Sequence, residues 1–240
     1  RGKAELQLLV DATNSVRART VDYYIQAILA GMAVDAKGPP LPGGGLGLDV
    51  RVLYNPSMKS SIFMVPAVMI LVLTISATIL TCMAIAKEKE AGTMEMLISA
   101  PVSSWEILAG KTIPYIIVGL TELPLVFAVV IGWFEVPMRG PVWALILGAT
   151  LFVCTMSGVG TLISTIASTQ QQAMMGCFMF LIPAIMLSGI IFPIENMPDP
   201  VRWITYFDPL RYFVKILRNV MLKGGDPSVV WPNLLALAVL

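Results

Sequence analysis

Long apolar runs separated by short polar segments dominate the chain from residue 62 onward. A helix of about 20 apolar residues crosses the hydrocarbon core of a membrane, and four of the runs reach that length. A fifth run begins at Val229 and continues for twelve residues to Leu240. The pattern therefore predicts an all-α polytopic membrane protein with four full spans and part of a fifth. The full spans are expected at Ile62–Ala86, Thr112–Phe134, Val142–Ala167 and Ala173–Phe192.

The first 60 residues alternate between short apolar runs and polar or glycine-rich stretches. The elements predicted there are a strand at Leu6–Val10, a helix at Arg17–Ala30, a loop at Gly38–Gly47 and a second strand at Val50–Tyr54. We therefore expect two domains: residues 1–60, which form part of a small α/β domain, and residues 61–240, which form the membrane domain. Because the chain opens without Met and closes inside an apolar run, we expect a piece of a longer protein that lacks a segment at each end.

The polar segment Lys87–Lys111 is the longest charged interruption between two of the apolar runs, with four acidic residues and three lysines. Gly92-Thr93 is expected to end the preceding helix, with Thr93 as the N-cap of a short helix at Met94–Ser99. Pro101 is expected to stop that helix, and either Ser103 or Ser104 is expected to cap the next one. The segment therefore predicts a short polar helix held between two spans, outside the lipid.

Met94, Leu97 and Ile98 give this short helix a small apolar face. An amphipathic helix of this kind can seat in a groove on a partner protein. An ordinary solvated loop with a run of charges explains the same pattern, and the spacing alone does not decide between the two interpretations.

Composition agrees with a membrane protein and excludes several kinds of chemistry. The chain is 57% hydrophobic and 13% charged, with a mean hydropathy of +0.81, whereas soluble domains carry about 25% charged residues. Its net charge of +1 gives no electrostatic case for binding nucleic acid. With no histidine in the chain, histidine-based catalysis and metal binding are excluded. We predict no catalytic residue, metal site or cofactor; Cys82, Cys154 and Cys177 all lie in apolar runs.

Glu122 lies near the middle of the second span, between Pro114 and Pro124, which are expected to kink it. A carboxylate at that depth is costly and normally faces a protein interior or an aqueous path. One hypothesis makes Glu122 a residue of the substrate pathway. The other makes it a protonated or paired structural residue.

The third span carries small residues at four-residue spacing, which allow helices to approach closely. They are Ser157, Gly158, Gly160, Thr161, Ser164 and Ser168.

The segment Pro193–Ser228 is polar with apolar interludes. A helix is expected to begin at Pro209 with Asp208 as its cap and to end at Gly224. Its apolar and basic residues fall on different faces, which is typical of a helix lying in the membrane interface and contacting lipid. The basic face comprises Arg211, Lys215 and Arg218.

The polar segment also resembles a known family. Its sequence, KEKEAGTMEMLISAPVSSWEILAGK, is similar to the loop after the second span of ABC-2 type permeases, the membrane subunits of ABC exporters. Three further stretches agree: YNPSMKSSIFMVP, LSGIIFPIENMP and FDPLRYFVKILRNVMLKG. The resemblance covers nearly all of residues 50–240. Residues 1–60 are similar to the end of the extracytoplasmic domain of drug-exporter-like members.

This resemblance implies a six-span permease of which the first span is missing here. It places a coupling helix within Glu88–Glu106, docked on a separate ATPase subunit, and it assigns this role to Glu88, Glu90, Gly92, Thr93, Glu95, Leu97 and Pro101. Such permeases work in the plasma (inner) membrane as homodimers or heterodimers with two ATPase subunits, and the substrate passes between the two permeases. The chain has no GxxxxGK[ST] motif and cannot bind ATP by that route itself.

Charge alone favours the opposite orientation. The polar segment carries only three of the 16 Lys and Arg residues, although cytoplasmic loops normally carry the excess. We follow the motif, because large translocated domains escape the charge rule and the first span usually dominates it. An ATP-independent channel or secondary transporter is the alternative function. An intramembrane enzyme lacks the acid–base groups it would need.

Overall fold

The structure is a computed structural model, and it describes residues 5–11, 18–21, 23–25, 27–28, 47–53, 60–99 and 101–240. The chain divides into two compact units, Arg1–Met64 and Val65–Leu240. In the first unit, β1 (Glu5–Asp11) and β2 (Gly47–Leu53) pair in parallel, with Leu8 opposite Val50. The described residues between 18 and 28 are helical, as predicted. Gly47 begins β2 instead of ending the predicted loop, and Tyr54 lies outside the described residues.

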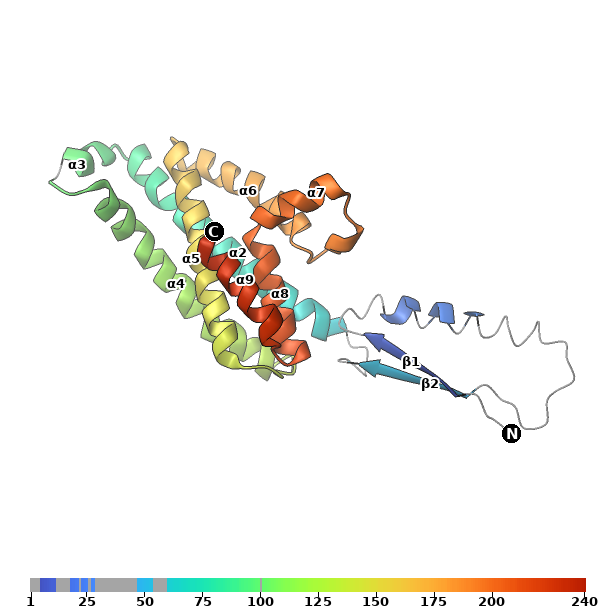
Figure 1. The fold of residues 1–240 in the computed structure, drawn as a ribbon. Helices are drawn as coiled ribbons and strands as arrows, with labels where there is room; N and C mark the ends of the chain where they lie inside the picture. The colour runs from blue at the N-terminus through green and yellow to red at the C-terminus, as the bar shows by residue number, and fades with distance from the viewer. Residues whose placement is uncertain are drawn as a thin grey trace, which may run out of the picture. The chain divides into compact units, whose positions relative to one another are not determined.

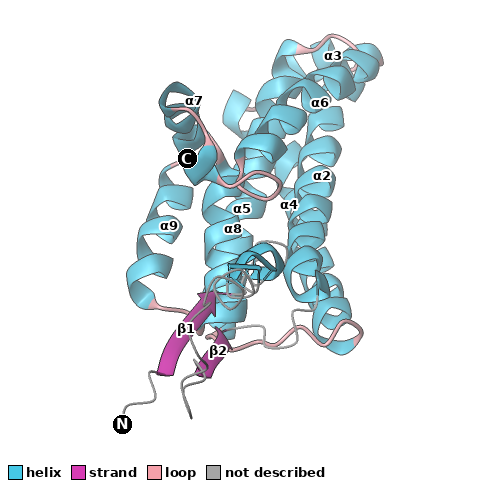
Figure 2. Cartoon of the chain, turned by 90° about the vertical axis from the view of Figure 1, so that its right-hand side faces the viewer, coloured by secondary structure: helices cyan, strands magenta, loops and turns pink. Residues whose placement is uncertain are grey.

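The second unit contains four helices that are long and apolar enough to cross a membrane. They confirm the four predicted spans, and they form a bundle in Figures 1 and 2. The long helices are α2 (Ser60–Glu90), α4 (Ser104–Gly132), α5 (Val142–Ile166) and α6 (Gln170–Leu187), followed later by the shorter α9 (Pro227–Val239). The shorter elements are α3 (Met94–Ser99), η1 (Ile194–Asn196), α7 (Asp199–Ile204), η2 (Thr205–Phe207), α8 (Pro209–Arg218) and the π-helical turn η3 (Asn219–Lys223).

Helix boundaries differ from the apolar runs in an informative way. Helix α2 continues past Ala86 to Glu90, and α4 begins at Ser104, before its apolar part starts at Thr112. Alanine, lysine and glutamate favour helix in water, which allows α2 to continue beyond its apolar run. Helix α6 stops at Leu187, short of the predicted Phe192, because Gly189 takes a left-handed conformation with φ of 84°.

Helix α5 is central to the bundle and contacts α4, α6, α8 and α9. It approaches α2 closely at Gly160, where an added Cβ would lie 2.1 Å from the Thr81 hydroxyl oxygen and 2.6 Å from the Thr78 carbonyl oxygen. Three of the small residues, Ser157, Gly160 and Ser164, are buried. Gly158 faces open space, whereas the Thr161 hydroxyl lies 3.2 Å from the Thr112 hydroxyl on α4.

Helix α8 corrects the expectation of an interfacial helix, because it is buried within the bundle. Phe213 stacks on Phe152 of α5 with ring centroids 4.5 Å apart, and α8 also packs along α9. Of its basic residues, Arg211 is only 7% exposed and lies 4.0 Å above the Tyr206 ring, whereas Lys215 is exposed. The apolar face that was predicted to meet lipid meets α5 and α9 instead.

The predicted ends of this segment are confirmed. Asp208 caps α8 by accepting a hydrogen bond of 3.0 Å from the Leu210 N–H. Gly224, with φ of 92°, closes the π-helical turn that follows α8. Burial raises the pKa of Asp208 to about 7, although the Leu210 N–H and the charge of Arg211 act in the opposite direction.

Gly160 and Gly158 offer a matched pair of substitutions. Gly160→Ala should lower the free energy of unfolding by about 2 kcal/mol, because the new methyl group collides with α2. Gly158→Ala should leave it unchanged or raise it by up to about 1 kcal/mol, since alanine favours helix and the methyl group meets open space. Thermal unfolding in detergent measures both. Equal effects of the two substitutions would contradict the close contact at Gly160.

Asp208 should make stability depend on pH. Its folded pKa lies above the ordinary value of about 4, so the folded protein keeps a proton that the unfolded chain releases, and stability falls as pH rises from about 4 to about 7 and slightly beyond. Between pH 6 and pH 8 the loss should be about 1.4 kcal/mol. Asp208→Asn keeps an oxygen that can accept from Leu210 and should remove this dependence. A variant that retains the wild-type pH slope of the melting temperature would assign the slope to another group.

Candidate functional site

The polar segment after α2 lies outside the apolar spans and carries most of the predicted site residues. Helix α3 forms at Met94–Ser99 as predicted, and Figure 1 shows it at the tip of the two long helices α2 and α4. Met96 on α3 is 71% exposed and Trp105, at the start of α4, is 81% exposed. The tip therefore presents large apolar side chains beside charged ones.

Gly92 ends α2 in a left-handed conformation with φ of 73°, which glycine adopts without steric cost. The Thr93 N–H then donates to the Glu88 carbonyl over 3.1 Å. The Thr93 hydroxyl also donates to Glu88, both to its carbonyl and to its carboxylate. This corrects the expected N-cap role of Thr93: its hydroxyl points back to α2, because the left-handed turn at Gly92 brings it under the last turn of that helix.

Glu88 joins α2 to α4. Its carboxylate accepts from the Lys111 ammonium over 2.5 Å and from the Thr93 hydroxyl. Both members of the ion pair are partly exposed, with side-chain exposures of 24% for Glu88 and 34% for Lys111. A partly exposed pair adds little stability by itself, so its main effect here is to hold the start of α4 beside the end of α2.

The next two residues bind the connection between α5 and α6. Lys89 donates to the carbonyl oxygens of Thr165 and Ala167, the latter over 3.0 Å. Glu90 accepts two hydrogen bonds of 3.0 Å from Gln170, one from its backbone N–H and one from its side-chain amide. Sequence reasoning assigned Glu90 to the segment but missed Lys89, because no local pattern shows which distant helix a charged side chain will reach.

The remaining predicted coupling residues lie at the exposed tip. Glu95 is exposed in the first turn of α3, and Pro101 is exposed in the loop before α4. Leu97 belongs to α3, but its side chain lies outside the described part of the structure. The segment therefore has two parts, a base where Glu88 and Glu90 bind neighbouring helices and a tip that carries Glu95 and Pro101.

Ser103, not Ser104, caps α4. Its N–H donates to the Glu106 carboxylate over 2.7 Å, and its hydroxyl oxygen accepts from the Glu106 N–H over 3.4 Å. This reciprocal pair is a capping box. It fixes where the polar loop ends and the second long helix begins.

Glu122 lies on α4, away from the polar segment, and is half-buried. Its carboxylate accepts a hydrogen bond of 2.6 Å from the Ser76 hydroxyl on α2. The structure therefore brings Glu122 together with a polar side chain of the neighbouring span. This contact agrees with the paired interpretation and leaves a role in the substrate pathway as a hypothesis.

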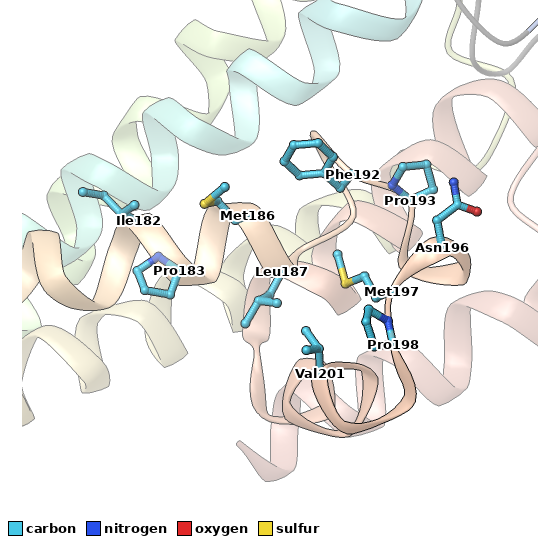
Figure 3. A pocket seen from close by; sticks show the side chains of 10 residues that line it. All are labelled: Ile182, Pro183, Met186, Leu187, Phe192, Pro193, Asn196, Met197, Pro198 and Val201. Carbon is cyan, nitrogen blue, oxygen red and sulfur yellow. The ribbon is translucent and has the colours of Figure 1, made fainter.

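A pocket of about 530 Å³ lies between the end of α6 and the η1–α7 segment, and Figure 3 shows its lining side chains. Aliphatic, methionine, phenylalanine and proline side chains dominate the lining, and Asn196 is its polar member. Methionine side chains adapt readily to the shape of an apolar ligand. The lining residues are Ile182, Pro183, Met186, Leu187, Phe192, Pro193, Asn196, Met197, Pro198 and Val201.

Among the residues that the structure describes, no group of three or more Cys, Asp or Glu side chains could hold a metal ion. Cys82 and Cys177 are buried in the contact between α2 and α6, where they donate to backbone carbonyls.

Comparison with known proteins gives consistent matches along the chain. The family model for ABC-2 family transporter proteins matches residues 2–240. The chain is 35% identical over 238 residues to the "Probable multidrug ABC transporter permease YbhR" of Escherichia coli K12, covering 99% of this chain and 64% of that protein. It is 37% identical over 196 residues to the "Probable multidrug ABC transporter permease YbhS" of the same organism, covering 80% of this chain and 51% of that protein.

A third relative, the "Inner membrane transport permease YhhJ" of Escherichia coli K12, is 30% identical over 241 residues, which cover 97% of this chain and 63% of that protein. The chain thus spans less than two thirds of the length of each of these relatives. No solved structure matches the chain.

A double-mutant cycle measures the contact between Ser76 and Glu122. Ser76→Ala, Glu122→Ala and the double variant should give a coupling free energy of about 0.6 kcal/mol, the average for hydrogen bonds between membrane helices, and at most about 1.7 kcal/mol. Unfolding in detergent or bicelles supplies the four free energies. A coupling of zero would remove the hydrogen bond as the reason for Glu122 being tolerated at this depth.

Proposed function

Because the chain belongs to the ABC-2 family of transporter proteins, we propose that it is the permease subunit of an ABC exporter, driven by a separate ATPase subunit. It is a multi-pass membrane protein with four membrane-length helices. The observation that carries the proposal is α3, a short helix with exposed side chains that lies between two long apolar helices, beside the Glu88–Lys111 ion pair and the Ser103–Glu106 capping box. A loop that only connected α2 to α4 would require neither a helix of its own nor the ion pair and cap on either side of it.

The docking surface of the ATPase subunit is the tip of the polar segment. Glu95 and Trp105 are exposed there, and they combine charge with apolar area, as helix-in-groove contacts do. The other assigned residues, Glu88, Glu90, Gly92, Thr93, Leu97 and Pro101, shape the segment or border this surface. The ATPase chain binds and hydrolyses ATP, and the permease has no catalytic residue.

Transport then follows from rigid-body motion. ATP binding closes the two ATPase subunits and moves each α3. Because Lys111 ties α4 to Glu88 of α2, the two long helices follow together. Packed helices move as bodies between discrete arrangements, and this motion opens the path between the permease subunits.

A second permease subunit, identical or different, completes the path. Only 17% of the apolar 18-residue stretch of α4 and 22% of that of α6 is buried, against 56% for α2. The exposed sides of α4 and α6 therefore contact lipid or the second subunit. Glu122 and the apolar pocket at the end of α6 lie on the same two helices. Two of the relatives carry the word multidrug in their names, which favours small apolar cargo.

Orientation follows from the same proposal. The ATPase is cytoplasmic, so α3 faces the cytoplasm and residues 1–60 form part of an extracytoplasmic α/β domain. One relative is named an inner membrane permease, and we place this chain in the plasma (inner) membrane. Few basic residues lie on the cytoplasmic side in this orientation, and translocation of the N-terminal domain outweighs that charge bias.

Charge reversal at Glu95 tests the docking surface in the full-length complex. Glu95→Lys should reduce co-purification of the ATPase about tenfold or more, because a reversed charge at an interface costs at least about 1.4 kcal/mol. Glu135→Lys, in the exposed turn between α4 and α5, is the matched control and should change nothing. Transport of ethidium that persists without any ATPase subunit would favour a channel or secondary transporter. Full assembly and ATP hydrolysis of Glu95→Lys would exclude this residue from the dock.

A further inference from the structure

The last turn of α2, Lys87–Glu90, holds three consecutive charged side chains that bind three different helices. Glu88 binds α4, Lys89 binds the end of α5, and Glu90 binds the start of α6. Successive residues on a helix point about 100° apart, so this turn can reach three neighbours only where their ends meet around it. The bonds to α5 and α6 go beyond what linking α2 to α4 through α3 requires.

Each of the two further bonds suits the helix end that it meets. Lys89 donates to carbonyl oxygens at the C-terminus of α5, where the helix dipole is negative. Glu90 accepts from the first N–H of α6, where the dipole is positive. Both bonds involve a charged group and are therefore stronger than neutral hydrogen bonds. An opposite arrangement of the two charges would repel both helix ends.

Packing directly below these bonds limits sliding between α2 and its neighbours. The Ser164 hydroxyl oxygen lies 2.9 Å from the Ala86 N–H, and Gly160 puts the backbones of α2 and α5 in direct contact. On the α6 side, Cys82 donates to the Ala173 carbonyl over 3.1 Å. A hydrogen bond at the end of α2 can thus transmit a displacement of α2 to α5 and α6, because the adjacent turns are packed too closely to slide past one another.

We infer that Lys89 and Glu90 are positioning residues that lock the α5–α6 connection to the last turn of α2, so that α3 and the start of α6 move as one body. This inference rests on the proposed function, in which the ATPase moves α3. It extends that function by naming a route from the dock to α6. Helix α6 is largely uncovered in this chain and borders the apolar pocket, so its displacement would alter the surface offered to cargo.

Distances between spin labels test the inference in the full-length permease with its ATPase. Labels replace Met96 on α3 and Met175 on α6, which are 71% and 67% exposed. This pair should keep its distance between the nucleotide-free complex and the complex trapped with ATP and vanadate. A reference pair at Met96 and Val239, on α9, should change its distance, because α9 has no bond to the last turn of α2 among those seen in the described residues.

Substitutions then remove the lock. With Lys89→Met and Glu90→Ala together, the Met96–Met175 distance should change on trapping. Lys89→Arg and Glu90→Gln should retain a constant distance, since each keeps a group able to make the bond. Lys87→Met is the matched control, because Lys87 is exposed on the same turn, and it should behave as the wild type.

The outcomes separate the inference from the proposed function. A Met96–Met175 distance that changes in the wild type, or that stays fixed in the Lys89→Met, Glu90→Ala variant, overturns the inference alone. A reference distance that never changes while ATP is hydrolysed overturns the proposed coupling, and the inference with it. If the double variant does not assemble, the wild-type Met96–Met175 distance still tests the inference, which a changed distance would overturn.

Discussion

The contact of two backbones at Gly160 is the constraint on which the rest of the membrane unit depends. Because no side chain separates α5 from α2 there, Thr78, Thr81 and Cys82 lie directly against the α5 surface. That contact sets how far along each other the two helices run, and so brings the end of α2 level with the end of α5. Charged residues at the end of α2 can then reach the α5–α6 connection. A single methyl group at Gly160 would disturb both the packing and this alignment.

Several charged side chains in this unit contact a helix end, an aromatic ring or a hydroxyl group. Lys89 and Glu90 meet helix termini of opposite polarity, and the Arg211 guanidinium lies over the Tyr206 ring and donates to Thr205. Glu122, the acidic residue deep in a span, accepts from Ser76. Since an unpaired charge in an apolar environment is costly, these partners explain how a bundle with so much apolar surface tolerates ionisable groups.

Local rules predicted much of the fold and part of the site. The apolar runs located the four spans, Gly92 and Pro101 bounded α3, and the adjacent Ser103 and Ser104 marked the start of α4 without showing which of them caps it. What local rules missed depends on tertiary neighbours. The Thr93 hydroxyl turned back to α2, and α8 was buried because α5 and α9 cover its apolar face. The partners of Lys89 and Glu90 lie more than 70 residues away in sequence, and no spacing within residues 87–111 encodes them.

The central claim is that a short helix outside the lipid transmits work from a cytoplasmic ATPase, so the side of the membrane that α3 faces decides it most directly. The measurement uses the full-length protein, expressed without its ATPase subunit so that docking does not cover residue 96. It carries Met96→Cys, with Cys154 replaced by alanine, and the reagent is a maleimide that does not cross membranes. Cys82 and Cys177 are buried, which leaves residue 96 as the reactive position among the described residues. Our account predicts labelling in inverted vesicles and none in intact cells. Labelling in intact cells with none in inverted vesicles would contradict it.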